Sequence, residues 1–284
     1  MKKHKILDSN TILGYILVNI LYVILIYFGL LNIFSGIIYL LGVGEELATV
    51  IGMILAGILS FIIFKLWFRG EFDGFYGSPR NGLGMGESFV TGLKDGWIFF
   101  LYMIFIVLLG LIFGKLQGPS IAILLSSMSA GIGEEIMFRA FPLAYLMRRV
   151  KTRKGLLAAM IVTALVFGLI HLANITSGAG VAISIFQAFG ATCMGLIFAY
   201  VYLRSGNILA CMLLHTFTDF ACFLDVSQVS AEGIQIATHL TIANYFDLVF
   251  MFVFLIYIVV RLRKPGRLDE ILAFWDKKWN KTEK

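Results

Sequence analysis

Two adjacent glutamates, Glu134 and Glu135, stand within an apolar stretch of the chain, and Arg139 follows four residues after the second. An ionised side chain at the centre of a lipid bilayer costs roughly 2.5–3.5 kcal/mol on insertion scales. Three such side chains in one apolar segment therefore indicate a function that uses at least one of them. This segment is the first candidate for a catalytic site.

Helical geometry separates the two glutamates. Residues four apart share a face of a helix, whereas neighbours point about 100° apart. We therefore expect Glu135 and Arg139 to form an ion pair, which lowers the cost of holding either charge in lipid. Glu134 has no cation on its own face and is the better candidate for a chemical role. The alternative is a purely structural ion-pair cluster that locks two helices together.

Two histidines stand in other apolar runs. His171 precedes Asn174 by three residues, and His215 precedes Asp219 by four, so each has a polar companion on its own side of a helix. A single intramembrane histidine more often bonds a neighbouring helix than catalyses a reaction. Two of them beside a glutamate pair favour hydrolysis, which needs a base, an acid and donors for a developing oxyanion.

The composition is typical of a membrane protein. Hydrophobic residues make up 60% of the 284-residue chain and charged residues only 14%, well below the quarter that is usual in soluble domains. The net charge of +6 does not indicate a nucleic-acid partner, because the basic residues fall between apolar runs. The three cysteines lie inside those runs and form no disulfide framework.

We expect an all-α polytopic bundle of about eight spans, because eight apolar runs can cross a ~30 Å hydrocarbon core at ~1.5 Å per residue. The runs are Thr11–Leu31, Leu47–Trp67, Gly96–Phe113, Ser120–Met147, Leu156–Asn174, Val181–Leu203, Asn207–Leu224 and Ile242–Arg261. Pro142 and the charged residues of the fourth run favour a tilt or kink there. His171 falls nearer the end of its run than Glu134 and His215 do, so bringing them together requires a tilted or broken helix.

Basic residues occupy alternate connections between these runs. The basic set is Lys2, Lys3, Lys5, Lys65, Arg69, Arg80, Lys94, Arg148, Arg149, Lys151, Arg153, Lys154, Arg204, Arg261, Arg263, Lys264 and Arg267, whereas Lys115 alone lies in the opposite set. Positive loops favour the cytoplasmic side, which predicts that both termini are cytoplasmic. The high Ile, Phe and Lys content favours a prokaryotic plasma membrane.

The last residues form a separate segment. We predict one transmembrane domain over residues 1–263, with its motif core at 131–219, and a cytoplasmic tail at 264–284. Apolar residues recur at helical spacing in the tail, among them Trp275 and Trp279, with lysines between or after them. This pattern predicts an amphipathic interfacial helix that lies on the leaflet with its Trp rings at headgroup depth.

Three of these groups resemble the motifs of one known family. Glu134-Glu135-x-x-x-Arg139, Phe167-x-x-x-His171 and His215-x-x-x-Asp219 occur in the order found in the membrane-embedded CAAX-protease and bacteriocin-processing family, also called Abi or CPBP. The segment from Leu203 to Ile208 is similar to the R-[ST]-G-x-[IL] lead-in of the third motif. Together the motifs cover about a third of the chain.

The resemblance implies an intramembrane endopeptidase of glutamic type without a cofactor. In that family the first glutamate and the second-motif histidine, here Glu134 and His171, activate a water molecule. His215 and Asp219 would stabilise the oxyanion, while Glu135 and Arg139 would orient and charge-balance the site. The substrate would be a membrane-associated peptide or protein, prenylated or not, such as a leader, a pheromone precursor or a bacteriocin.

Asp219 departs from the family pattern, in which many members have Asn. An ionised aspartate repels an oxyanion, so Asp219 must be protonated or must act as the hydrogen-bond acceptor that orients His215.

Several rival hypotheses stay open. Glu134, His171 and His215 form a set suited to catalytic zinc, although H-E-x-x-H is absent. Cys211 lies one turn before His215 and permits a thiol–histidine pair. A non-proteolytic protein of the same fold, such as a scaffold or bacteriocin-immunity protein, and an ion-coupled transporter are the alternatives outside proteolysis.

Overall fold

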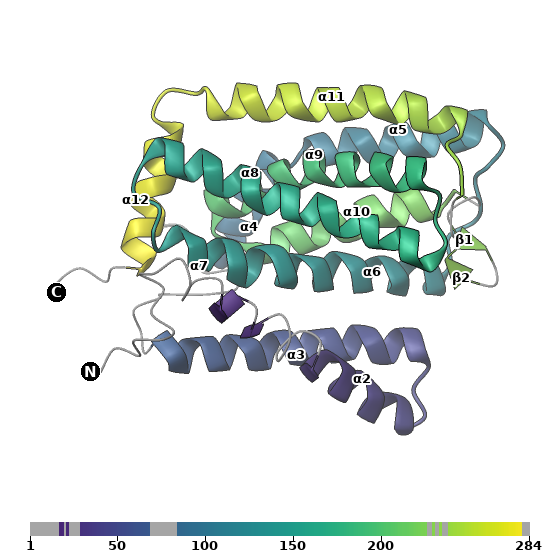
Figure 1. The fold of residues 1–284 in the computed structure, drawn as a ribbon, viewed down its shortest axis with the longest axis horizontal. Helices are drawn as coiled ribbons and strands as arrows, with labels where there is room; N and C mark the ends of the chain where they lie inside the picture. Colours follow the sequence, from purple (N-terminus) through teal and green to yellow (C-terminus); the bar gives the residue numbers. More distant parts are fainter. Residues whose placement is uncertain are drawn as a thin grey trace.

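We describe the protein from a computed structural model, in which residues 17–19, 21–22, 29–68, 84–225, 229–230, 233–234 and 238–279 are described. Over these residues the chain forms a bundle of helices (Figure 1). The only strands in this part of the chain are two residues long each, β1 (Val229–Ser230) and β2 (Gly233–Ile234), and they pair antiparallel. The expected all-α class is confirmed.

Within each continuous described stretch, the helices follow one another along the chain with short connections. They are α2 (Leu31–Leu40), α3 (Glu45–Phe68), α4 (Met85–Asp95), α5 (Ile98–Ile112), α6 (Ile121–Glu135), the π-helix η2 (Ile136–Leu143), α7 (Ala144–Met147), α8 (Arg153–Leu169), the 3-10 helix η3 (Ile170–Ser177), α9 (Val181–Ser205), α10 (Ile208–Phe223), α11 (Ile242–Leu262) and α12 (Arg267–Trp279). The long helices run side by side, and α12 lies across one end of the bundle (Figure 1).

Four helical segments of the described chain are long and apolar enough to cross a membrane: Ile121–Met147, Arg153–Thr176, Val181–Ser205 and Ile242–Leu262. A fifth is possible if α4 and α5, which are bent by 53° at their junction, form one span. Each expected span from Leu47–Trp67 onward contains a helix, while Thr11–Leu31 lies largely outside the described residues. The number eight therefore stays a prediction.

Helices α2 and α4 lie where the sequence analysis expected connections. Helix α4 has only 11 residues, and those it buries are Ser88, Gly92 and Asp95. The buried face of α4 consists of small and polar residues. The sequence of α4 therefore contains no apolar run, and the hydropathy pattern did not predict this helix. Its contact with the bundle is close, because a Cβ at Gly92 would lie 2.5 Å from Cβ of Ala210 on α10.

Close helix packing depends on small residues at two crossings. A Cβ at Gly131 of α6 would lie 2.5 Å from the backbone nitrogen of Thr216 on α10. A Cβ at Gly168 of α8 would lie 2.4 Å from the carbonyl oxygen of Ala188 on α9. Small residues at such crossings let the backbones of membrane helices approach each other. Both crossings lie next to residues of the candidate motifs.

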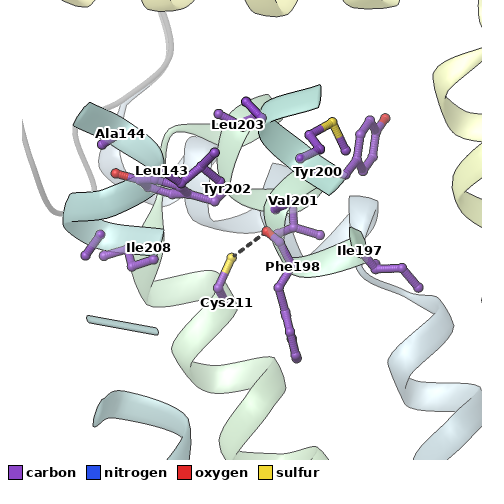
Figure 2. Packing of buried hydrophobic residues seen from close by; sticks show 14 of the residues in the cluster. Leu143, Ala144, Ile197, Phe198, Tyr200, Val201, Tyr202, Leu203, Ile208 and Cys211 are labelled. Atoms are coloured by element: carbon purple, nitrogen blue, oxygen red, sulfur yellow. Dashed lines mark hydrogen bonds between the residues drawn. The ribbon is translucent and has the colours of Figure 1, made fainter. Parts of the chain in front are cut away.

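The core lies where η2, α7, α9 and α10 meet. Figure 2 shows the buried side chains of Leu143 and Ala144 against the α9 segment from Ile197 to Leu203 and against Ile208 of α10. Large apolar side chains elsewhere stay exposed in the bundle, notably on α5, α8 and α11. A helix with such an outer face is suited to contact with lipid chains.

The prediction for the tail is partly wrong. Helix α12 is amphipathic, but Trp275 and Trp279 are buried against the bundle, so their rings do not face lipid as in a helix that lies freely on the leaflet. Nε1 of Trp275 donates to the carbonyl of Leu203, and Nε1 of Trp279 to that of Ala144, both at 2.9 Å. Carbonyls in the last turn of a helix have no partner within it. The indole of Trp275 bonds such a carbonyl in the last turn of α9, and that of Trp279 bonds a carbonyl in the single turn of α7. Both bonds hold α12 on the protein.

Candidate active site

The expected ion pair between Glu135 and Arg139 forms at the end of α6. Nη1 of Arg139 donates to Oε1 of Glu135 at 2.8 Å, and the two side chains are 1% and 0% exposed. The guanidinium lies over the ring of Phe167, 4.0 Å from its centroid. Gly195 of α9 leaves room for it, because a Cβ there would lie 3.2 Å from Nη2. The pair is thus enclosed by aromatic and backbone surfaces.

The helix changes its winding directly after Glu135. Residues Ile136–Leu143 form the π-helix η2, which contains Pro142, yet the span from Ile121 to Met147 continues through it. A proline removes one backbone donor and clashes with a regular α-helical turn. The wider π turns accommodate the proline. The tilt or kink expected at Pro142 therefore takes the form of a change from α-helical to π-helical winding. Such π segments are frequent at functional sites.

His215 of α10 lies at the centre of the cluster. Its Nδ1 is 2.9 Å from Oε1 of Glu135, and its Nε2 is 3.6 Å from both Oε2 of Glu134 and Oδ2 of Asp219. The imidazole is 4% exposed and stacks on Phe198, with ring centroids 4.8 Å apart. One histidine therefore contacts all three carboxylates of the first and third motifs.

The carboxylates differ in their access to the surroundings. The side chain of Glu134 is 29% exposed and that of Asp219 is 20% exposed, whereas Glu135 is completely buried. The difference between Glu134 and Glu135 follows from the rotation of about 100° between neighbouring residues of a helix. Glu134 and Asp219 are the acids that a water molecule or a substrate can reach.

His171 lies in η3, where α8 tightens into a 3-10 helix. Its Nδ1 is 3.0 Å from the carbonyl oxygen of Phe167, and its ring meets that of Phe167 edge-on at 5.4 Å. It interacts electrostatically with Asp219 and His215. The sequence predicted a tilted or broken helix near His171, and the structure has a change from α-helix to 3-10 helix at Ile170. His171 thus borders the cluster without joining its hydrogen bonds.

The polar companion of His171 turns elsewhere. Nδ2 of Asn174 donates to Oε1 of Gln187 on α9 at 3.1 Å. This bond ties η3 to α9. Asn174 therefore has a structural role in this arrangement. Its spacing from His171 did not predict this role.

The lead-in to the third motif forms the turn between α9 and α10. Gly206 ends α9 with a φ of 71°, a left-handed conformation that glycine adopts without steric cost. Asn207 caps α10 by accepting from the backbone nitrogen of Leu209, and its Nδ2 donates to Oγ of Ser88 on α4 at 2.9 Å. This turn sets the height of His215 along the bundle.

Cys211 does not form the thiol–histidine pair that its spacing permitted. Its Sγ donates to the carbonyl of Phe198 at 3.5 Å, within the packed core (Figure 2). Its side chain is completely buried. The residue acts as a small packing side chain here.

In the described part of the chain, no three His, Cys, Asp or Glu side chains are arranged to hold a metal ion. The zinc set of Glu134, His171 and His215 is therefore not preformed in this conformation.

Phe198 is the residue of this site that sequence reasoning missed. Its ring supports His215 from one side and lies 5.4 Å from the Arg139 guanidinium. In the sequence it is one aromatic residue in an apolar run, with no polar neighbour or motif to distinguish it. Only the packing of α9 against η2 and α10 reveals its position.

Comparison with known proteins gives one result. Residues 116–221 match the family model described as type II CAAX prenyl endopeptidase Rce1-like. This range includes all the candidate residues, from Glu134 to Asp219. No curated protein and no solved structure matches the chain.

Proposed function

Because residues 116–221 match the family model of the Rce1-like type II CAAX prenyl endopeptidases, we propose that the chain is an intramembrane endopeptidase of glutamic type. Its apolar helices agree with an integral membrane protein. One observation carries the mechanistic proposal: Glu134 presents an accessible carboxylate beside His215, while the neighbouring Glu135 is buried with Arg139.

Glu134 and His171 activate the water in this proposal. Glu134 takes a proton from water, and the resulting hydroxide attacks the carbonyl carbon of the scissile peptide bond. The carbon–nitrogen bond then breaks, and the leaving amine receives the proton. The accessibility of Glu134 and the position of His171 at the border of the cluster support these roles.

His215 stabilises the oxyanion through Nε2. Its Nδ1 faces Oε1 of Glu135, so Glu135 is the acceptor that orients the ring. For Nε2 to donate to an oxyanion while Nδ1 donates to Glu135, the ring must carry both protons. Asp219 then has no orienting role to fill at Nδ1. Its carboxyl group lies 3.6 Å from Nε2, so in this proposal it is protonated when the oxyanion forms, because an ionised carboxylate there would repel the oxyanion.

The geometry also favours a second pairing within the same reaction. Glu134 has its ion-pair contact with His215, at 3.6 Å, and His171 is joined to the cluster only electrostatically. In this variant Glu134 and His215 activate the water, and His171 serves the leaving group. Mutant kinetics distinguish the two arrangements.

The substrate is a membrane-associated peptide or protein whose cleaved bond enters the bundle near Glu134. We further propose a prokaryotic plasma membrane with both termini cytoplasmic. The described basic residues support this orientation, because Arg153 and Arg204 contact α12 at one end of the bundle. A cysteine placed at Lys154 should react with an impermeant reagent only from the cytoplasmic side, and one at Lys115 only from outside. The reverse pattern contradicts the orientation.

The proposed activity is tested by comparing the membrane-associated peptides of cells that carry the wild type or Glu134→Gln. The proposal expects uncleaved precursors to accumulate with Glu134→Gln and not with Glu87→Gln, which removes an exposed carboxylate of α4. Equal peptide profiles in all three strains would favour a non-proteolytic scaffold, an immunity protein or a transporter.

A further inference from the structure

A second charged cluster lies at the end of the bundle where α12 packs. Asp95, at the end of α4, forms an ion pair with Nη2 of Arg261 on α11 and lies 3.7 Å from Nε of Arg204 on α9. Glu270 of α12 lies 4.0 Å from Nη2 of Arg204 and 3.3 Å from Nη1 of Arg267. We call Arg204, Arg261 and Arg267 the arginine cluster.

The charges of this cluster do not balance. Three guanidinium groups face two carboxylates, and Arg261 and Arg267 are close enough to interact electrostatically with each other. Within the described residues, Nε of each arginine and Nη1 of Arg204 are buried without a hydrogen-bond partner. Unpaired buried donors and uncompensated charge are costly. An additional anion at the exposed part of these side chains would compensate the excess positive charge.

The cluster is open to such an anion on its outer side. The three side chains keep 15%, 17% and 12% of their surface exposed. Arg263 and Lys264 follow directly after α11 and are exposed, which adds two positive charges beside Arg261. The local charge therefore strongly favours a negatively charged ligand.

Neighbouring aromatic residues place the cluster at the depth of lipid headgroups. Trp97, at the junction of α4 and α5, is 45% exposed and meets the ring of Tyr257 edge-on at 6.0 Å. The Tyr257 hydroxyl donates to the carbonyl of Asp95 at 2.6 Å. Trp and Tyr are enriched at membrane–water interfaces, so the pair marks the boundary between apolar helix faces and the arginine cluster.

Apolar faces extend from this boundary into the membrane region. Helices α5 and α11 pack against each other near it, through Tyr102 and Phe254. Their exposed residues closest to the boundary are Phe100, Leu101, Ile104, Ile256, Val259 and Val260. The charged site and a surface suited to acyl chains are thus continuous.

We propose that the arginine cluster binds the phosphate of an anionic phospholipid whose acyl chains lie along the exposed faces of α5 and α11. Guanidinium groups match phosphate oxygens in charge and geometry. Basic sites beside transmembrane helices bind anionic headgroups in this way. The bound lipid would join α4, α9, α11 and α12 at one point, away from the candidate catalytic residues.

The test uses the full-length protein in detergent, with phosphatidylglycerol or phosphatidylcholine added as the probe. Native mass spectrometry measures lipid retained, and thermal unfolding measures the rise in Tm. We expect phosphatidylglycerol to bind and to raise Tm, and phosphatidylcholine to do neither. Each basic residue removed should weaken binding roughly fivefold, since a charge near the membrane surface contributes about 1 kcal/mol.

Two variants and one control keep the test decisive. Arg261→Gln removes a cluster member, and R263Q/K264Q removes two exposed charges that form no ion pair within the described part of the chain. The second variant should fold normally and still lose about 25-fold in affinity. The control R149Q/K154Q removes one charge between α7 and α8 and one in the first turn of α8.

Three outcomes would overturn the proposal. The first is equal retention of the two lipids by the wild type, and the second is an equal loss of binding in R149Q/K154Q and R263Q/K264Q. The third is a rise in Tm with millimolar inorganic phosphate that matches the rise with phosphatidylglycerol, which would assign the site to a free anion.

Discussion

Oε1 of Glu135 lies 2.9 Å from Nδ1 of His215, and this contact joins α6 to α10. The same oxygen accepts from Arg139 at 2.8 Å. One buried carboxylate oxygen therefore holds a cation of its own helix and the imidazole of another. The two adjacent glutamates therefore have different environments: Glu135 holds the histidine, and Glu134 stays accessible beside it.

The two glutamates should differ in their effect on stability. Glu135→Ala leaves Arg139 and His215 buried without their shared acceptor, and breaking a buried pair typically costs about 3–5 kcal/mol. Glu134→Gln keeps the shape of an accessible side chain and should leave the thermal stability in detergent nearly unchanged. Thermal unfolding of both variants measures the difference, and equal losses contradict the division of roles.

The crossing at Gly131 should be essential to the site. A Cβ there would lie 2.5 Å from the backbone nitrogen of Thr216, so Gly131→Ala must push α10 away from α6. Overpacking of this kind costs about 1–3 kcal/mol, and it also separates Glu135 from His215. Gly86→Ala on α4 is the matched control, because nothing lies within 4 Å of its Cβ position. We expect proteolysis in cells to fail with the first variant and to persist with the second.

The two contacts of Glu135, with Arg139 and with His215, differ in how far the sequence could predict them. The Glu135–Arg139 pair was predictable because both residues lie on one helix, where spacing determines direction. The Glu135–His215 contact was not, since it depends on how closely two helices cross. Asp219 was the expected partner of the ring for the same reason: it lies on the same helix as His215.

The tail shows the same limit. Its amphipathic pattern correctly predicts that one face of α12 is covered, but periodicity does not distinguish lipid from protein as the cover. The indole nitrogens of Trp275 and Trp279 donate to the carbonyls of Leu203 on α9 and Ala144 on α7, and these bonds favour the protein as the cover. The positions of those carbonyls come from the fold, so the tail sequence alone could not reveal them.

Removing the indole donor of Trp279 should therefore destabilise the bundle. Trp279→Phe keeps an aromatic ring but leaves the buried carbonyl of Ala144 without its partner, at a cost of about 1–3 kcal/mol. Asp269→Asn is the control, because it removes the exposed ion pair between α12 and Arg153, and solvent-exposed pairs of this kind contribute little to stability. Thermal unfolding in detergent should rank the first variant well below the second. A tail that lies on the leaflet predicts no difference between them.

Double mutants should identify the base pair. If Glu134 and His171 act together on one water, the Glu134→Gln, His171→Ala double variant is barely slower than either single variant, because residues that act as a unit are non-additive. The Glu134→Gln, His215→Ala combination should then be slower than either of its single variants. Cleavage rates of an accumulated precursor, measured with purified protein, decide between the two. The opposite result assigns the water to Glu134 and His215.

Hydrolysis should proceed without a metal ion. The proposed chemistry uses a carboxylate and two imidazoles, so EDTA or phenanthroline should leave the cleavage rate of a peptide substrate unchanged. Any metalloprotease that copurifies is controlled for by the Glu134→Gln protein, prepared in the same way. Loss of cleavage with chelator and its return with added zinc would make Glu134, His171 and His215 metal ligands. Such a site requires the three side chains to approach each other more closely than they do in this conformation, and the oxyanion role of His215 would fail with the glutamic mechanism.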